Sequence, residues 1–191
     1  MKIKIIRECG YTEALLGLGL SYGITSEHDV NYFMIDHDLR NRMYGVALKL
    51  ADKDGGHNKF LETIAVWLDV AGPAYWWIEF DTYRIGVSKQ SESTMHTVIR
   101  NEIKGFMFEG GLDDVVVERL EKIRLDGDLL RLKRELPMSF IQRRIICLNY
   151  KVLRHMIKQR KNHRLPEWKL FCTEILSQIK YPEFINNDVE I

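Results

Sequence analysis

The pattern of polar and apolar residues along the chain predicts extended segments in three places. Charged and apolar side chains alternate over residues 2–6 (KIKII), which is the period of a strand with one buried face. The run LETIAVWLDVA (61–71) is rich in β-branched and aromatic residues, so it predicts a strand or a buried helical turn. Residues 84–88 (RIGVS) have the same strand character. These segments supply the β part of a mixed fold.

Helical patterns occupy most of the remaining chain. Thr12 is a suitable N-cap for a helix beginning at EALLGLGL. A second helix is predicted over residues 38–52 and is closed by the glycine-containing stop DKDGG. Pro73 favours a helix over PAYWWIEF, because proline is tolerated in a first helical turn. Residues 111–134 are charged and helical in pattern. Together these elements predict one α+β domain over residues 1–191, without an internal repeat.

The segment MSFIQRRIICLNYKVLRHMIKQR (138–160) is predicted to form one long helix. At about 100° per residue, its aliphatic side chains cover roughly half of the circumference, so the helix should be largely buried. Gln142, Asn149 and Arg160 fall within that apolar arc. A buried guanidinium requires an anionic partner, which an internal carboxylate or a ligand could supply. The opposite face carries four basic side chains: Arg144, Lys151, His155 and Lys158.

Composition narrows the class of protein. The 191 residues carry a formal net charge of +1, which gives no global field for nucleic acid. The basic run KQRKNHR (158–164) lacks interleaved aromatic residues, so nucleic acid is not expected as a partner. No apolar run is long enough to span a bilayer. Cys9, Cys147 and Cys172 lack the spacing of a zinc site, and we expect reduced thiols in a cytoplasmic protein without a bound metal.

The stretch YRIGVSKQSESTMH (83–96) combines one arginine with several hydroxyl side chains. A solvated loop has this composition, and so does a loop that cradles a phosphorylated small molecule through backbone N–H groups and hydroxyls. The hydroxyl-bearing residues are Ser88, Ser91, Ser93 and Thr94.

Two sequence blocks resemble the flavin-dependent thymidylate synthases. In GHNKFLE (56–62), His57 and Glu62 keep the family's spacing of a histidine and a glutamate five residues later. In the block from Leu136 to Arg160, Asn149 follows Pro137 by twelve residues, and Arg160 follows eleven residues after that. The similarity extends over roughly residues 15–170 and implies the fold of that family, a twisted sheet with packed helices.

The resemblance implies FAD as the cofactor and a pyrimidine deoxynucleotide, deoxyuridylate (dUMP), as the substrate. A one-carbon unit is added at C5 and reduced by the flavin, with NADPH and methylenetetrahydrofolate as co-substrates. Arg160 would act catalytically as a cation beside the pyrimidine carbonyl. The FAD-contacting positions would be Ser21, His57, Glu62, Arg84, Asn149, Lys151 and His155. The nucleotide-contacting positions would be Glu79, Ser88, Gln90, Ser91, Ser93, Lys133 and Arg160.

The chain departs from the family pattern around the hydroxyl-rich stretch 83–96. Thr82 and Tyr83 replace an arginine and a histidine, and Met95 replaces the closing arginine. Gln90 and Ser91 replace an asparagine and a glutamate. Each lost charged hydrogen bond is worth about 1.5–3 kcal/mol. Glu79 replaces a glutamine and could favour an amino-bearing pyrimidine such as deoxycytidylate.

Two other functions stay open at this point. A non-catalytic relative could keep the fold and bind a nucleotide, and an unrelated helical protein could bind nucleic acid through residues 158–164. The family also assembles as a homotetramer. We therefore expect a homo-oligomer whose site is shared between subunits.

Overall fold

A computed structural model describes residues 1–53 and 56–186, and the side chains of all of these except residues 27–29. The chain divides into two compact units. Unit 1 comprises Met1–Ile3, Asp69–Arg84 and Lys89–Ile146. Unit 2 comprises Lys4–Leu68, Ile85–Ser88 and the chain from Cys147 onward. Each unit is therefore assembled from segments that are separated in the sequence.

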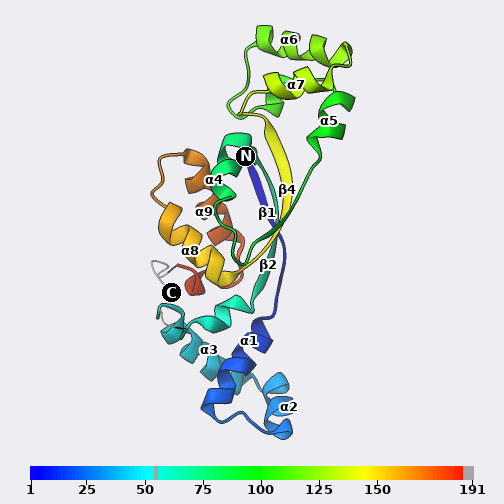
Figure 1. Cartoon of the computed structure of the whole chain (residues 1–191). Coiled ribbons are helices and arrows are strands. Elements are labelled where there is room, and N and C mark those ends of the chain that lie inside the picture. Colours follow the sequence, from blue (N-terminus) through cyan, green and yellow to red (C-terminus); the bar gives the residue numbers. More distant parts are fainter. Residues whose placement is uncertain (54–55, 187–191) are drawn as a thin grey trace. The chain divides into compact units, whose positions relative to one another are not determined.

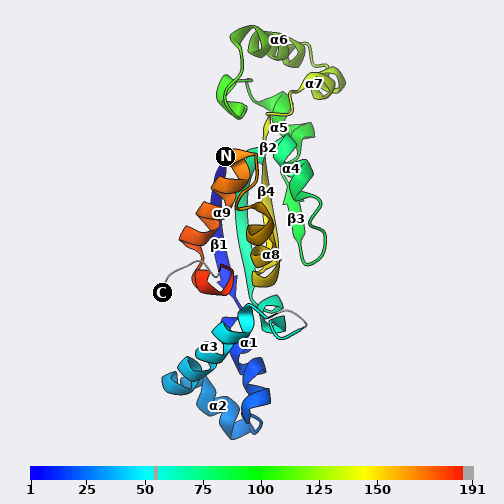
Figure 2. The same cartoon turned by 90° about the vertical axis from the view of Figure 1, so that its left-hand side faces the viewer.

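Four antiparallel strands form one sheet in the order β1-β2-β4-β3 (Figure 1 and Figure 2). They are β1 (Lys2–Cys9), β2 (Ala65–Pro73), β3 (Ser88–Ser91) and β4 (Ile141–Asn149). The predicted strand at residues 2–6 is confirmed, and the segment 61–71 is a strand from Ala65 onward. The prediction for RIGVS was wrong except at its last residue. Gly86 has φ +70° in a turn there, so the strand begins only at Ser88.

Unit 1 contains four helices and one short turn in its described residues: α4 (Ala74–Phe80), α5 (Thr94–Arg100), η3 (Gly105–Met107), α6 (Asp114–Leu125) and α7 (Leu129–Glu135). On α4, Trp76, Trp77 and Phe80 are fully buried and their rings contact one another. Helices α6 and α7 lie side by side (Figure 1). A second apolar cluster, which includes Leu120, Ile123 and Leu132, packs them together. The helices predicted at Pro73 and over residues 111–134 are confirmed, the latter as two helices.

Unit 2 contains α1 (Tyr11–Gly19), η1 (Leu20–Tyr22), α2 (Glu27–Ile35), α3 (His37–Ala51), η2 (Lys59–Glu62), α8 (Tyr150–Arg160), α9 (Pro166–Gln178) and η4 (Pro182–Phe184). Helices α8 and α9 lie side by side (Figure 2). Their buried faces carry Leu153, Met156, Trp168 and Phe171. The helix predicted over 38–52 is confirmed as α3. Of its predicted stop, Asp54 and Gly55 lie outside the described residues.

The turn from β1 into α1 depends on a glycine. Gly10 has φ +90°, and a Cβ built there would lie 2.3 Å from the carbonyl oxygen of Thr63. Only glycine adopts this conformation at such close approach without strain. Gly10 is also the N-cap residue of α1, so Thr12 lies inside the helix and its prediction as the N-cap was wrong.

Glu8 at the end of β1 joins three segments of unit 2. The hydroxyl of Tyr150 at the start of α8 donates a hydrogen bond to Glu8 Oε2. The backbone N–H of Lys180, which follows α9, donates to Glu8 Oε1 at 3.0 Å. Tyr150 is fully buried, and this burial, together with the Glu8 carboxylate, raises the pKa of its phenol. Glu8 therefore holds the beginning of the chain against its last helices.

The single long helix predicted over residues 138–160 was wrong. Its first part is strand β4, and α8 begins only at Tyr150. Asn149 separates the two elements, because its backbone is extended (φ −128°, ψ 170°) and its Oδ1 accepts a hydrogen bond from the N–H of Val152 at 3.0 Å. That is the geometry of a helix N-cap. Gln142, Asn149 and Arg160 therefore do not share a helical face.

Three further features concern the described residues as a group. No helix among them is both long enough and apolar enough to cross a membrane. No set of three or more histidine, cysteine, aspartate or glutamate side chains in residues 1–53 and 56–186 is placed to hold a metal ion. Cys9, Cys147 and Cys172 are all free thiols, and burial raises the pKa of Cys172 to about 11.

Candidate functional site

The junction of β4 and α8 brings two of the sequence blocks together within unit 2. Asn149 is half-buried there, with its Oδ1 occupied by the capping bond from Val152. A Cβ built on Gly86 would lie 3.3 Å from Asn149 Nδ2 and 3.0 Å from Val152 Cγ2. The turn at Gly86 is part of the hydroxyl-rich stretch. That stretch and the asparagine therefore meet at this point, and a side chain at residue 86 would press on the asparagine amide.

Two of the predicted FAD-contacting residues form an ion pair. Lys151 Nζ lies 2.5 Å from Glu62 Oε1, although 89 residues separate them in the sequence. His57 precedes η2 and is exposed, and Ser21 is exposed in η1. His57 and Ser21 belong to unit 2 as well, and neither forms a hydrogen bond or an ion pair with Glu62 or Lys151. The ion pair thus brings together two of the predicted FAD-contacting residues, Glu62 and Lys151.

A row of cationic and polar side chains follows α8. Residues 151, 154, 155, 158 and 161 recur at helical spacing, so they share one face. A cavity of about 350 Å³ lies along this face, lined by Asp52, Asn58, Lys151, Arg154, His155, Lys158 and Gln159. A second cavity of about 210 Å³ is lined by Asp52, Arg154, Ile157, Lys158, Lys161, Ile185 and Asn186. Because the two share three residues, we treat them as one basic groove, the α8 groove.

The charges of the α8 groove are partly balanced from within. Arg154 forms an ion pair with Asp52 and also donates to the carbonyl oxygen of Phe184 at 3.2 Å. Lys151 pairs with Glu62. No ion pair of Lys158 with a described carboxylate lies within 4.0 Å, and its side chain is exposed. The groove therefore keeps an excess of positive charge, which suits an anionic ligand.

Arg160, the last residue of α8, is held by an aromatic ring. Its guanidinium carbon lies 4.7 Å from the ring centroid of Trp168, which is fully buried in α9. A cation over an indole face is attracted by the ring's quadrupole. The sequence argument for Arg160, a guanidinium within the apolar arc of a long helix, was wrong because that helix does not exist. Arg160 stands at a helix C-terminus instead, where a cation also offsets the helix dipole.

Replacing Arg160 by alanine should destabilise the protein without ligand. The lost cation–π contact and the lost dipole interaction together predict a decrease of about 1–2 kcal/mol in the free energy of unfolding. Urea unfolding followed by circular dichroism measures it. Arg164→Ala, an exposed arginine four residues further on, is the control and should leave stability nearly unchanged. An unchanged stability of Arg160→Ala would show that neither the Trp168 ring nor the helix dipole holds this arginine.

Most of the predicted nucleotide-contacting residues fall in unit 1, whereas Ser88 and Arg160 belong to unit 2. In unit 1, Gln90 and Ser91 are exposed on β3, and Ser93 precedes α5 without a side-chain capping bond. Lys133 on α7 is exposed, and its Nζ lies 3.5 Å from Met95 Sδ. The remaining predicted nucleotide-contacting residues are Glu79, half-buried on α4, and Ser88, exposed at the unit 2 end of β3. Arg84, predicted to contact FAD, is exposed after α4.

A network that the sequence analysis missed surrounds the end of α4. Asp81 accepts hydrogen bonds from Arg144 at 2.9 Å and 3.1 Å and from Lys89. The Arg144 guanidinium lies 4.3 Å from the ring centroid of Trp77. Partial burial of Asp81 favours its protonated form, but the bonds from Lys89 and Arg144 outweigh burial, and its pKa lies below the usual value. Arg144 was expected on the basic face of a long helix and lies partly buried in β4 instead.

Other residues of interest had no signal in the sequence blocks. Asp52, Asn58 and Arg154 line the α8 groove, and the spacing of residues 151, 154 and 158 on one helical face could have indicated Arg154. Asn58 is buried, and its Nδ2 donates to the carbonyl oxygen of Ala51 at 3.2 Å. It follows α3 in the chain and packs against the end of that helix. Such a contact is visible only once α3 is placed.

Comparison of the sequence alone identifies no relative. No protein-family model matches the chain, and no curated protein matches it significantly. Comparison of the structure gives clear matches. The flavin-dependent thymidylate synthase ThyX from Helicobacter pylori, complexed with FAD and dUMP, matches over 100% of both chains with a TM-score of 0.77 and 14% identity. The chain has the fold of the flavin-dependent thymidylate synthases.

Two further structures agree with this assignment of the fold. A second ThyX structure from Helicobacter pylori, with FAD and dUMP, matches over 98% of both chains with a TM-score of 0.74 and 12% identity. The UMP/dUMP methylase PolB from Streptomyces cacaoi, bound with 5-Br dUMP, matches over 92% of this chain and 88% of its own, with a TM-score of 0.66 and 14% identity. The thymidylate synthase fold expected from the two sequence blocks is therefore confirmed. The residue roles within it stay predictions.

Proposed function

We propose that the protein is an FAD-dependent enzyme that adds and reduces a one-carbon unit on a pyrimidine deoxynucleotide such as dUMP. The observation that carries the proposal is the full-length likeness to ThyX, whose compared structures hold FAD and dUMP. The likeness to a UMP/dUMP methylase supports a pyrimidine nucleotide as the substrate class. NADPH and methylenetetrahydrofolate as co-substrates, a homotetramer and a cytoplasmic location belong to the same proposal.

The α8 groove offers the donors that the diphosphate of FAD requires. Lys151, Arg154 and Lys158 bring three cationic side chains to a cavity that holds one carboxylate, Asp52. Cationic and neutral N–H donors at one groove suit phosphate oxygens, because charge-assisted hydrogen bonds are the stronger class. His155 and Gln159 add further polar groups. The residues present therefore fit an anionic dinucleotide, and we assign FAD to this groove.

When bound, FAD supplies the hydride that reduces the one-carbon unit at C5, so the protein's task is orientation and electrostatics. Trp168 restricts the Arg160 guanidinium, which then offers a cation of fixed position for charge developing on the pyrimidine ring. Hydroxyls of Ser91 and Ser93, with the Lys133 ammonium, are assigned to the nucleotide phosphate. No side-chain nucleophile is needed in this scheme.

A non-catalytic nucleotide-binding protein with the same fold is the second candidate. It is favoured by the positions at which charged family residues are replaced, namely Thr82, Tyr83 and Met95. Lys133 also contacts the Met95 thioether, where the family has an arginine. Such a protein would bind the nucleotide without turning it over.

The visible spectrum of the purified protein, before and after addition of FAD, tests the proposal. We expect the absorbance of oxidised flavin to remain with the protein after gel filtration. Addition of dUMP or deoxycytidylate should then perturb that spectrum, and the stronger perturbation identifies the pyrimidine that Glu79 favours. Nucleotide binding without flavin binding would support the second candidate. A protein that binds neither at high micromolar concentration would contradict both.

A further inference from the structure

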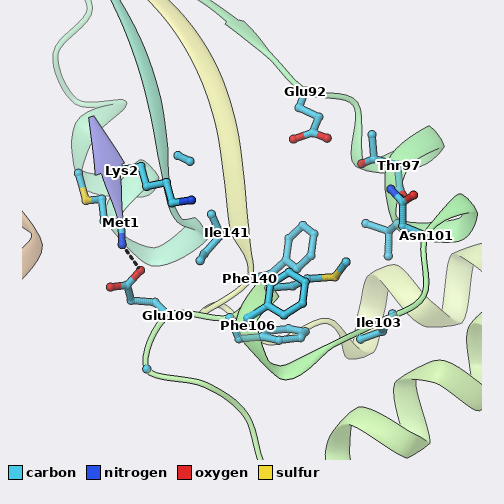
Figure 3. Close-up of a pocket in the computed structure, with 15 residues that line it drawn as sticks. Met1, Lys2, Glu92, Thr97, Asn101, Ile103, Phe106, Glu109, Phe140 and Ile141 are labelled. Carbon is cyan, nitrogen blue, oxygen red and sulfur yellow. Dashed lines mark hydrogen bonds and ion pairs between the residues drawn. The ribbon is translucent and has the colours of Figure 1, made fainter. Parts of the chain in front are cut away.

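Unit 1 contains a further pocket. None of the residues assigned above to FAD or to the nucleotide lines it. Its volume is about 500 Å³, which lies in the range of sites for small molecules. The pocket is formed by the start of β1, the segment from β3 into α5, the turn η3 and the start of β4 (Figure 3). All of its lining residues belong to unit 1. It is therefore separate from the α8 groove.

The floor of the pocket is aromatic. Phe106, Phe108 and Phe140 line it, and the rings of Phe108 and Phe140 pack with centroids 5.7 Å apart (Figure 3). Phe108 is buried, whereas Phe106 is 75% exposed. Phe106 thus presents a large apolar surface at the pocket that the protein itself does not cover. A planar aromatic ligand would bury this surface against another ring.

One wall of the pocket offers several hydrogen-bond acceptors. Thr97 Oγ1 donates its proton to the carbonyl oxygen of Ser93 at 3.0 Å, and Asn101 Nδ2 donates to the carbonyl oxygen of Thr97 at 3.1 Å. The Thr97 hydroxyl oxygen and Asn101 Oδ1 consequently remain as acceptors. The carboxylate of Glu92 lies on the same side (Figure 3). It makes no hydrogen bond or ion pair with a described residue. A ligand that brings N–H donors can therefore bond to all three groups.

None of the described cations around the pocket forms an ion pair with Glu92 within 4.0 Å. The Met1 nitrogen forms an ion pair with Glu109 at 2.7 Å. The Arg143 guanidinium is bound by Asp69 at 2.8 Å and 2.6 Å, although the Glu92 carboxylate helps to raise the Arg143 pKa. Lys2 of β1 also lines the pocket. Its ammonium group forms no ion pair with a described carboxylate within 4.0 Å. Glu92 is thus the carboxylate available to a ligand.

From this geometry we propose that the pocket binds a small planar aromatic cation, such as an amidinium group on an aromatic ring. The ring packs on the phenylalanine floor, and its N–H groups donate to Glu92, Asn101 and Thr97. Two independent features select a cation, because carboxylates pair with it and the faces of phenylalanine rings attract it. The inference does not depend on the function proposed above.

Benzamidine is the probe, and isothermal titration of the full chain measures its binding. We expect saturable binding at one site per chain. Glu92→Gln should weaken it about tenfold or more, since a charged hydrogen bond is lost. Lys2→Met should tighten it, because a competing cation is removed. Glu102→Gln is the matched control, since Glu102 is exposed in the same segment, pairs with Lys104 and does not line the pocket.

Two further ligands separate the contributions of charge and ring. Benzoate has the same ring with the opposite charge and should not bind, and benzyl alcohol should bind more weakly than benzamidine. Phe106→Ala should weaken benzamidine binding without unfolding the protein, because this side chain is mostly exposed. Equal binding of benzoate and benzamidine, or equal affinity of wild type and Glu92→Gln, would overturn the proposal. So would an absence of binding combined with dissociation of an oligomer by Phe106→Ala, which would assign the pocket to a second copy of the chain.

Discussion

Trp77→Ala is expected to lower the free energy of unfolding by about 3–5 kcal/mol, the range for removal of a buried aromatic side chain. Trp77 is 1% exposed, and its rings contact Trp76 and Phe80 at centroid distances of 4.8 Å and 5.3 Å. Its Nε1 donates to the carbonyl oxygen of Gln142 at 3.0 Å. The substitution therefore opens a cavity, leaves a carbonyl without its partner and removes the aromatic neighbour of Arg144.

Urea unfolding of the full chain, followed by circular dichroism, measures this loss. Trp67→Ala is the control, because Trp67 lies on β2 and is 42% exposed. It should change stability by no more than about 1 kcal/mol, since surface substitutions away from special features have small effects. Similar losses in the two variants would show that Trp77 does not organise the core of unit 1.

Lys158→Glu is expected to weaken FAD binding by about 1.5–3 kcal/mol, the worth of a charge-assisted hydrogen bond, or about 10- to 150-fold in Kd. Lys158 lines both cavities of the α8 groove. Reversal of its charge removes a donor and places a carboxylate beside the proposed diphosphate site. Because Lys158 is exposed, the fold should tolerate the change.

Quenching of FAD fluorescence on titration with protein measures the affinity. Lys169→Glu provides the matched control, because Lys169 is an exposed lysine of α9 that lines neither cavity. Its net charge change is identical, so any general effect of charge appears in both variants. If both weaken FAD binding equally, FAD does not occupy the α8 groove, although the protein could still bind it elsewhere.

The sequence predicts an element correctly where its apolar positions fit the repeat of a strand or the repeat of a helix, but not both. KIKII alternates and is a strand, and the segment 38–52 is periodic and is a helix. The segment 138–160 was misassigned because its aliphatic residues are dense enough to satisfy both periods. In a strand, Ile146 and Leu148 point to one buried face with Cys147 between them, which a helical arc also accommodates. The stop signal was present in Asn149, a preferred N-cap residue, which was taken as a buried amide inside a continuous helix instead.

Within the candidate site, the sequence indicates residue types and leaves their partners undetermined. The resemblance singled out Glu62 and Lys151, and the ion pair between them requires η2 and α8 to be placed in space. Likewise, the partner of Arg160 was expected to be an anion and includes the Trp168 ring, which belongs to the next helix. The pocket of unit 1 combines residues from the start of β1 and from around α5 and η3, so no local sequence pattern indicates it.

The segmented composition of unit 2 has a consequence for the protein during its synthesis. Residues 69–84 and 89–146, which supply nearly all of unit 1, leave the ribosome before α8 and α9 do. Until then, Glu8 lacks both Tyr150 and Lys180, and the first sixty-eight residues have no α8 or α9 to pack against. The middle of the nascent chain can therefore fold before its beginning. The apolar surface of the beginning that α8 and α9 cover stays exposed until those helices have been synthesised.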